Sequence, residues 1–141
     1  MNAATATALA ATFTWLGMIL AISFLEAPLR FRAPGVTIPI GLSIGRLVFR
    51  ALNLAEAALA VTVTAAVLAG NAPGLTVAFT ATADALLAVQ TGVIRRPLSR
   101  RTSQVLAGAD PSRTRPHLYY VTAEIIKVIT LVSIGTSILA R

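Results

Sequence analysis

The stretch from Thr122 to Thr130 reads T-A-E-I-I-K-V-I-T and lies inside a long apolar run near the end of the chain. Glu124 and Lys127 are three residues apart, so any helix through this stretch carries both on one face. Ionisable side chains are costly at membrane depth and usually face a partner, a cavity or a substrate path. The stretch therefore predicts a helix with one face turned toward a polar interior.

The composition indicates a membrane protein. Of the 141 residues, 56% are hydrophobic and 12% are charged, and the mean hydropathy is +0.79, whereas soluble domains carry about 25% charged residues. The net charge of +7 does not indicate nucleic-acid binding, because the basic residues lie between apolar runs rather than on a soluble face. No cysteine, one histidine and two methionines leave too few ligands for a transition metal, so no metal and no cofactor are expected.

Four apolar runs are long enough to cross about 30 Å of hydrocarbon as helices. We expect an all-α, integral membrane four-helix bundle in one domain, residues 1–141, with helices at about 4–25, 42–68, 75–94 and 117–139. The predicted loops are 27–39 and 95–116, and the second has room for a short interfacial helix over 101–107. The first helix should end before Pro28. With no basic residue before Arg30, we interpret it as a retained membrane helix rather than a signal peptide.

The basic residues predict the orientation. Ten of the twelve lie in or beside the two long connections, four from Arg30 to Arg50 and six from Arg95 to Arg115. The short connection around Asn71 has none. The positive-inside rule then places both long loops in the cytoplasm and both termini outside, in a multi-pass protein of the cytoplasmic (inner) membrane.

The two halves of the chain resemble each other weakly. The segment 27–32 (A-P-L-R-F-R) resembles 96–101 (R-P-L-S-R-R), and Ala55-Glu56 resembles Ala123-Glu124. Two readings stay open. Either the chain holds two parallel helix-hairpin repeats, with Glu56 and Glu124 paired across a pseudo-two-fold axis, or the matches are coincidence.

Four of the five acidic residues lie in or at the end of a predicted helix, and Asp110 lies outside them. We expect the four to converge inside the bundle, with Asp84 deepest and with Lys127 and Arg46 or Arg50 as counter-charges. Trp15, in mid-helix, either packs against a neighbouring helix or lines a ligand pocket. The candidate ion- or substrate-binding residues are Asp84, Glu56, Glu124, Lys127, Glu26, Trp15, Asn53, Gln90, Tyr120 and Arg46.

Three functions fit these residues. The leading one is a small transporter or channel-like protein whose carboxylate cluster binds a small cation or couples to protons. An alternative is a membrane-embedded enzyme (isomerase, hydrolase or cyclase) in which Asp84, Glu56 or Glu124 is the general acid or base on a lipophilic small molecule. A further one is an accessory subunit whose charges only fix helix packing. The partners expected are the lipid bilayer and other copies of the chain in a homo-oligomer, because small residues on the first three helices allow close approach.

Four motifs carry a resemblance to a known family: Trp15-Leu16-Gly17; Ser23-Phe24 with Ala27-Pro28; Gly45-Arg46-Leu47-Val48-Phe49; and Glu124 to Lys127. With them the chain resembles small four-helix bacterial membrane proteins of unknown function, which are similar to transmembrane protein 205 and, more distantly, to copper-resistance D permeases. The resemblance implies a four-helix bundle and implies little about chemistry. The intramembrane histidine and methionine ligands that copper prefers are missing here.

Overall fold

A computed structural model describes residues 1–108 and 115–141, and the side chains within them outside 93–99, 101 and 115–117. The described residues are helical throughout, apart from short connections and the chain ends. The elements are α1 (Ala3–Ile19), η1 (Leu20–Glu26), α2 (Ala27–Arg30), α3 (Ile38–Ala69), α4 (Gly74–Val89), η2 (Gln90–Ile94), α5 (Arg95–Leu106) and α6 (Arg115–Leu139), in which η1 and η2 are π-helical.

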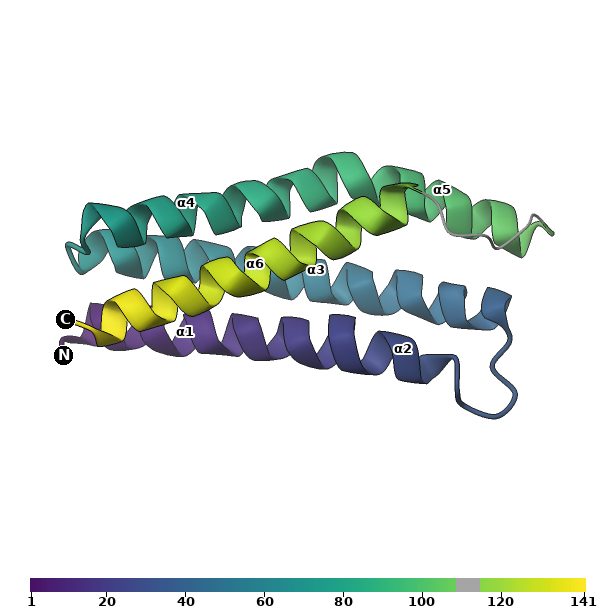
Figure 1. The fold of residues 1–141 in the computed structure, drawn as a ribbon, viewed down its shortest axis with the longest axis horizontal. Coiled ribbons are helices and arrows are strands. Elements are labelled where there is room, and N and C mark those ends of the chain that lie inside the picture. The colour runs from purple at the N-terminus through teal and green to yellow at the C-terminus, as the bar shows by residue number, and fades with distance from the viewer. Residues whose placement is uncertain (109–114) are drawn as a thin grey trace.

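The long helices form a ring. α1 packs against α3 and α6, and α4 packs against the same two helices, so α3 and α6 lie across the ring from each other. Figure 1 shows α1 and α4 running in one direction and α3 and α6 in the other. Both termini and the turn between α3 and α4 lie at one end, and the connection between α2 and α3 lies at the other. Side chains from all of these helices therefore meet along one central axis.

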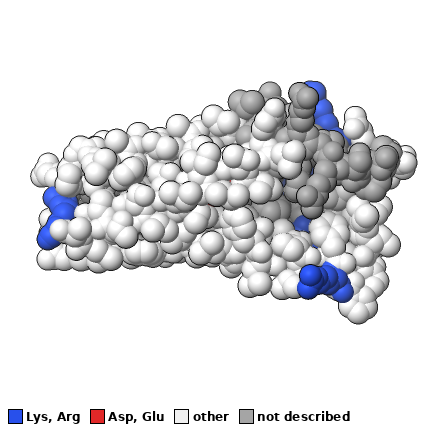
Figure 2. Space-filling model, in the orientation of Figure 1, with Lys and Arg blue, Asp and Glu red and all other residues white. Residues whose placement is uncertain are grey.

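Three helices among the described residues are long and apolar enough to span a membrane: Ala3–Arg30, Ile38–Ala69 and Leu118–Leu139, of 28, 32 and 22 residues. Only 33% to 44% of the residues in their most apolar 18-residue windows are buried inside the chain. Most of this apolar surface therefore faces outward, as expected of helices that contact lipid. On the face shown in Figure 2, the Lys and Arg side chains that the structure describes lie toward the two ends, and the described residues in the middle show no charged side chain.

Both predicted loops are partly helical, which corrects their boundaries. The first helix was predicted to end before Pro28, but it continues through η1 into α2 as far as Arg30. In this region the Ala27 N–H donates to the carbonyl oxygen of Ile22, five residues back. The wider π-helical turn changes the hydrogen-bond register just ahead of a residue that has no N–H, and Pro28 then lies in the first turn of α2, where proline is tolerated.

The second proline segment behaves in the same way. η2 precedes α5, and Pro97 lies in the first turn of that helix. α5 covers 95–106, most of it predicted as loop, because arginine, leucine and glutamine favour helix. The rest of that predicted loop, 109–114, lies outside the described residues. α3 starts at Ile38 instead of 42, because Thr37 caps it by accepting from the Ile40 N–H and Pro39 lies in its first turn.

The apolar core fills the half of the ring nearest the termini. It is built from the inward faces of α1, α3, α4 and α6, and its largest fully buried side chains are Trp15, Ile19, Val63, Leu131 and Ile134. The buried residues of the other half are mixed: polar side chains such as Asn53 and Gln90 lie there together with Leu52 and Val105. The boundary between the two halves lies where the Trp15 indole N–H donates to the Glu56 carboxylate.

Candidate functional site

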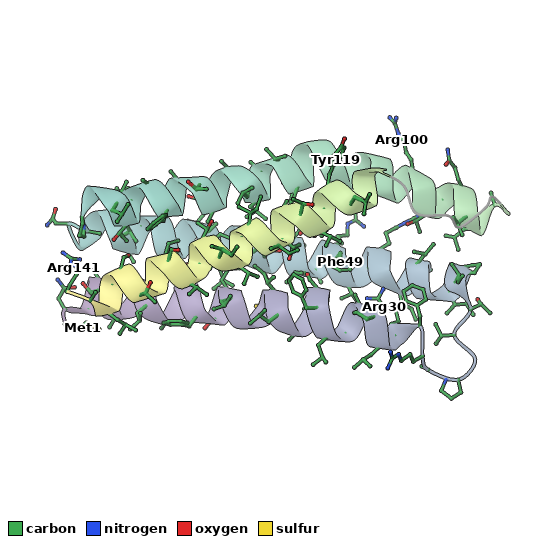
Figure 3. The ribbon with its side chains drawn as sticks, in the orientation of Figure 1. Met1, Arg30, Phe49, Arg100, Tyr119 and Arg141 are labelled. Atoms are coloured by element: carbon green, nitrogen blue, oxygen red, sulfur yellow. The ribbon has the colours of Figure 1, made fainter. Side chains whose placement is uncertain are left out.

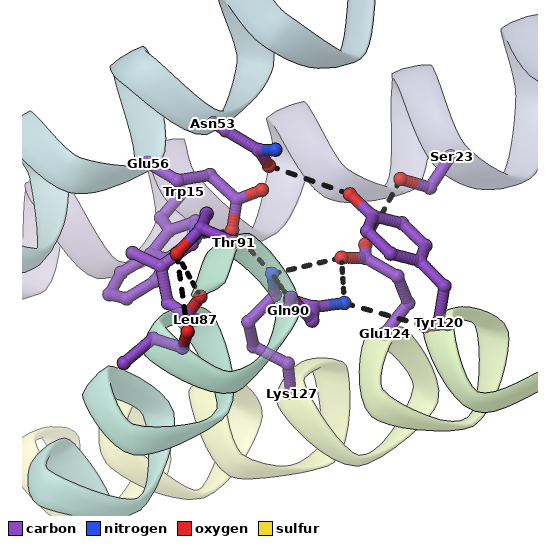
Figure 4. Close-up of polar contacts among 11 residues, drawn as sticks. Trp15, Ser23, Asn53, Glu56, Leu87, Gln90, Thr91, Tyr120, Glu124 and Lys127 are labelled. Carbon is purple, nitrogen blue, oxygen red and sulfur yellow. Dashed lines mark hydrogen bonds and ion pairs between the residues drawn. The ribbon is translucent and has the colours of Figure 1, made fainter. Parts of the chain in front are cut away.

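A buried polar cluster lies at the centre of the ring, with a side chain from each of four helical segments. We define the polar cluster as Trp15 of α1, Glu56 of α3, Gln90 of η2, and Glu124 and Lys127 of α6. Each of these residues is at most 2% exposed. Figure 4 shows their side chains converging between the helices.

Lys127 is the hub of the polar cluster. Its Nζ lies 2.5 Å from Glu56 Oε2 and 2.9 Å from Glu124 Oε1, and it also donates to Gln90 Oε1. An ammonium group has three protons to donate, so these three acceptors satisfy it. The contact with Glu56 crosses the ring from α6 to α3, two helices that otherwise meet mainly through their neighbours.

Glu124 is held at both carboxylate oxygens. Oε1 accepts from Gln90 Nε2 at 2.7 Å as well as pairing with Lys127, and Oε2 accepts from Ser23 Oγ at 3.0 Å. Gln90 thus accepts from the ammonium through its oxygen and donates to the carboxylate through its nitrogen. Ser23 and Gln90 lie in the two π-helical segments, η1 and η2, a type of local structure frequent at functional sites.

Glu56 is held at only one oxygen. Its Oε2 accepts from Trp15 Nε1 at 2.8 Å and from Lys127, whereas its Oε1 is buried and has no hydrogen-bond partner among the described residues. One turn earlier on α3, Asn53 Oδ1 accepts from the Tyr120 hydroxyl at 3.4 Å, while Asn53 Nδ2 is buried without a partner. Buried polar groups normally have a hydrogen-bond partner. Glu56 Oε1 and Asn53 Nδ2 are therefore the two atoms on this side of the network whose hydrogen bonds are not satisfied.

The periodicity of the sequence explains why these groups meet. Tyr120, Glu124, Lys127 and Leu131 follow one another at three- or four-residue steps and are all buried. The prediction that Glu124 and Lys127 share a face is confirmed, and Tyr120 lies on the same face. On α3, Asn53 and Glu56 are likewise one turn apart and face inward.

Seven of the ten candidate residues meet at or beside the polar cluster. They are Trp15, Asn53, Glu56, Gln90, Tyr120, Glu124 and Lys127. Trp15 is fully buried, with its indole N–H on a carboxylate.

The other three candidates lie elsewhere, so the prediction that the acids all converge is wrong. Asp84 is only partly buried and Glu56 and Glu124 are deeper; its Oδ2 accepts from Thr64 at 2.7 Å. Glu26 pairs with Arg30 one turn away, and Arg46 donates to Ser103 of α5 at 2.8 Å. Each has a hydrogen-bond or ion-pair partner outside the polar cluster, although Asp84 Oδ1 is buried without one among the described residues.

The sequence reasoning missed Ser23. A lone serine in an apolar helix usually hydrogen-bonds to a backbone carbonyl of its own helix, and nothing in its spacing indicated a carboxylate 101 residues away. Its place five residues before Pro28 was the available signal, because proline disturbs the helical register just ahead of it.

Replacing Gln90 by leucine tests how much the hydrogen bonds of the polar cluster contribute to the stability of the fold. The change removes an acceptor from Lys127 and a donor from Glu124. At roughly 1–3 kcal/mol for each buried charged group left short of a partner, we expect a loss of about 2–6 kcal/mol in the free energy of unfolding. Denaturation in mixed micelles, followed by Trp15 fluorescence, measures it. Thr91→Val is the matched control, because Thr91 bonds only to backbone carbonyls of α4. Equal stability of the two variants would contradict the network.

Comparisons with protein-family models, with curated proteins and with solved structures give no match.

Proposed function

We propose that this chain is an integral membrane protein whose four transmembrane helices enclose the polar cluster. Three membrane-length helices support this, and α4, which is also apolar, completes the ring between α3 and α6. An orientation with both termini outside the cytoplasmic membrane fits the arrangement, since the termini share one end with the uncharged turn and the arginine-rich α5 lies toward the other end.

The proposed function is that of a small transporter or channel-like protein that couples to protons through the polar cluster. Two carboxylates face one ammonium, so the cluster carries one net negative charge when all three groups are ionised. In a low-dielectric interior one unbalanced charge is costly, and one added proton balances it. The observation that carries the proposal is Glu56 Oε1, a buried carboxylate oxygen with no donor, where that proton can bind.

A proton fits this geometry better than a larger ion or a lipophilic substrate does. Lys127 Nζ already occupies the position between the carboxylates, so a second cation there would be repelled. The carboxylates of Glu56 and Glu124 are at most 2% exposed, which keeps a lipophilic substrate from touching them in this conformation. This burial also weighs against the enzyme alternative.

Glu56→Gln tests the proposal, because glutamine keeps the size and removes the titratable group. In lipid nanodiscs, infrared spectra recorded at high and low pH detect the C=O band of a carboxyl that gains a proton, and we expect Glu56→Gln to lose that band. In proteoliposomes under an imposed pH gradient, the same variant should lose proton flux, whereas Asp84→Asn keeps it because Asp84 lies outside the cluster. An unchanged band and unchanged flux in Glu56→Gln would refute proton binding at this site.

The accessory role remains the second candidate, and one observation favours it. All three protons of Lys127 and both carboxylate oxygens of Glu124 are engaged, as expected of a charge cluster that fixes helix packing. That reading predicts that an apolar replacement of all three charges, Glu56→Met and Glu124→Met with Lys127→Met, still assembles and supports the protein's role in the cell. Loss of proton flux in that folded triple variant would favour the transporter.

The geometry is also consistent with two helix-hairpin repeats. Glu56 and Glu124, the two glutamates matched in sequence, contact the same ammonium group. A π-helical segment precedes the proline-containing segment in each half. Both features are what a pseudo-two-fold axis along the membrane normal would generate.

A further inference from the structure

Two unpartnered polar atoms lie next to each other on α3. Asn53 Nδ2 can donate and Glu56 Oε1 can accept, and both are buried without a hydrogen-bond partner among the described residues. Asn53 is 4% exposed and Glu56 is fully buried. Residues three apart on a helix lie on the same face, and Figure 4 shows the two side chains next to each other, on the side of Tyr120.

We propose that these two atoms bind a single water molecule. A water molecule accepts from the Asn53 amide and donates to the Glu56 carboxylate, which satisfies both atoms at once. Buried waters typically make two to four hydrogen bonds to otherwise unsatisfied groups, and this site supplies one of each kind. A metal ion fits poorly here, because the Asn53 N–H group would point its positive end at the ion and Lys127 adds a second positive charge nearby.

An aromatic pair closes the site on one side. Phe49 lies one turn before Asn53 on α3, and its ring meets that of Tyr120 edge to face, with centroids 5.7 Å apart and planes at 83°. The Tyr120 hydroxyl donates to Asn53 Oδ1, so a hydrogen bond joins the aromatic pair to the water site. Figure 3 shows Phe49 toward the end of the molecule that holds Arg30 and Arg100, and away from Met1 and Arg141. The water site therefore lies on the side of Glu56 toward the arginine-rich end, and we infer that a proton from that end would reach Glu56 through this water, past the aromatic pair.

This route rests on the proposed proton binding at Glu56, but the water site can be tested separately. Hydroxyl-radical labelling in lipid nanodiscs, with rapid mixing into ¹⁸O-water, detects waters held beside buried side chains. Tyr120 is only 8% exposed, yet we expect it to be labelled, with ¹⁸O exchange slower than that of Tyr119, which is 57% exposed. Trp15, whose N–H is satisfied by Glu56, should stay unlabelled. A Tyr120 as unlabelled as Trp15 in the unmodified protein would overturn the site.

Asn53→Leu supplies the second measurement. Leucine fills a similar volume without a donor, so the slow label on Tyr120 should disappear while Tyr119 labelling stays unchanged. Unchanged Tyr120 labelling in this variant would also overturn the site. Trp15 fluorescence checks that the variant is folded, and the comparison within the unmodified protein holds even if it is not. Loss of the infrared carboxyl band in Glu56→Gln is independent of this label, so the water site and proton binding can fail separately.

Discussion

Replacing Lys127 by methionine is expected to destabilise the folded protein by about 3–5 kcal/mol, the usual cost of removing one partner from a buried ion pair. The change leaves Glu56 and Glu124 facing each other across the ring with no positive charge between them. It also leaves Gln90 Oε1 without its donor. Neither carboxylate can turn to water, because both are buried inside the ring. Unfolding in mixed micelles, followed by the fluorescence of the single tryptophan, measures the loss.

Three companion variants separate charge from packing. Arg141→Met removes a cation from the exposed chain end and should change stability by about 0.5 kcal/mol or less. Glu56→Gln in the Lys127→Met background removes one of the two opposed carboxylates and should restore part of the stability. Exchanging the charges, Glu56→Lys with Lys127→Glu, should be better tolerated than either single reversal. If Lys127→Met proves as stable as the unmodified protein, then Lys127 is not the hub of the network.

Much of the polar interior could be predicted because charge in an apolar run is a strong signal. Glu56, Glu124 and Lys127 stand out against hydrocarbon-compatible neighbours, and helical spacing alone gave Lys127 and Glu124 a common face. The cost of isolated charge in a membrane then required a shared interior. The all-helical fold followed from the same apolar runs, because backbone groups in lipid must be satisfied within the segment or within a closed sheet.

The placement of Asp84 and Ser23 could not be predicted, because it depends on contacts between helices that the periodicity of the sequence does not show. Asp84 sits in mid-helix as prominently as Glu56, but its Oδ2 accepts from Thr64 on the neighbouring helix, and its Oδ1 is buried without a partner among the described residues. Which acid turns inward depends on helix rotation, which is set by packing. Ser23 joins the site only because η1 widens the helix ahead of Pro28. The sequence predicts that the first helix ends before Pro28, whereas the π-helical turn ahead of this proline lets the helix continue beyond it.

Trp15 is the second position where a large effect on stability is expected. Two substitutions separate the contribution of its hydrogen bond from that of its packing. Trp15→Phe keeps an aromatic ring but removes the N–H that donates to Glu56 Oε2, so we expect a loss of about 1–3 kcal/mol. Trp15→Ala also opens a cavity between the apolar core and the polar cluster, which raises the expected loss to about 3–5 kcal/mol. Circular dichroism follows unfolding in these variants, since both lack the tryptophan.

Phe13 is the matched control for Trp15, because it lies two residues earlier on the same helix but is 41% exposed toward the lipid. Its ring packs over Gly135 of α6, so its replacement by alanine removes that contact, but it breaks no hydrogen bond and opens no fully buried cavity, and its cost should be below that of Trp15→Ala. The comparison also tests the boundary role of Trp15. If only core volume mattered, Trp15→Phe would cost no more than a small repacking. A clear loss in Trp15→Phe that vanishes when Glu56 is also changed to methionine would assign the energy to the indole–carboxylate hydrogen bond. A loss that persists unchanged in that background would assign it to packing and remove Trp15 from the polar cluster.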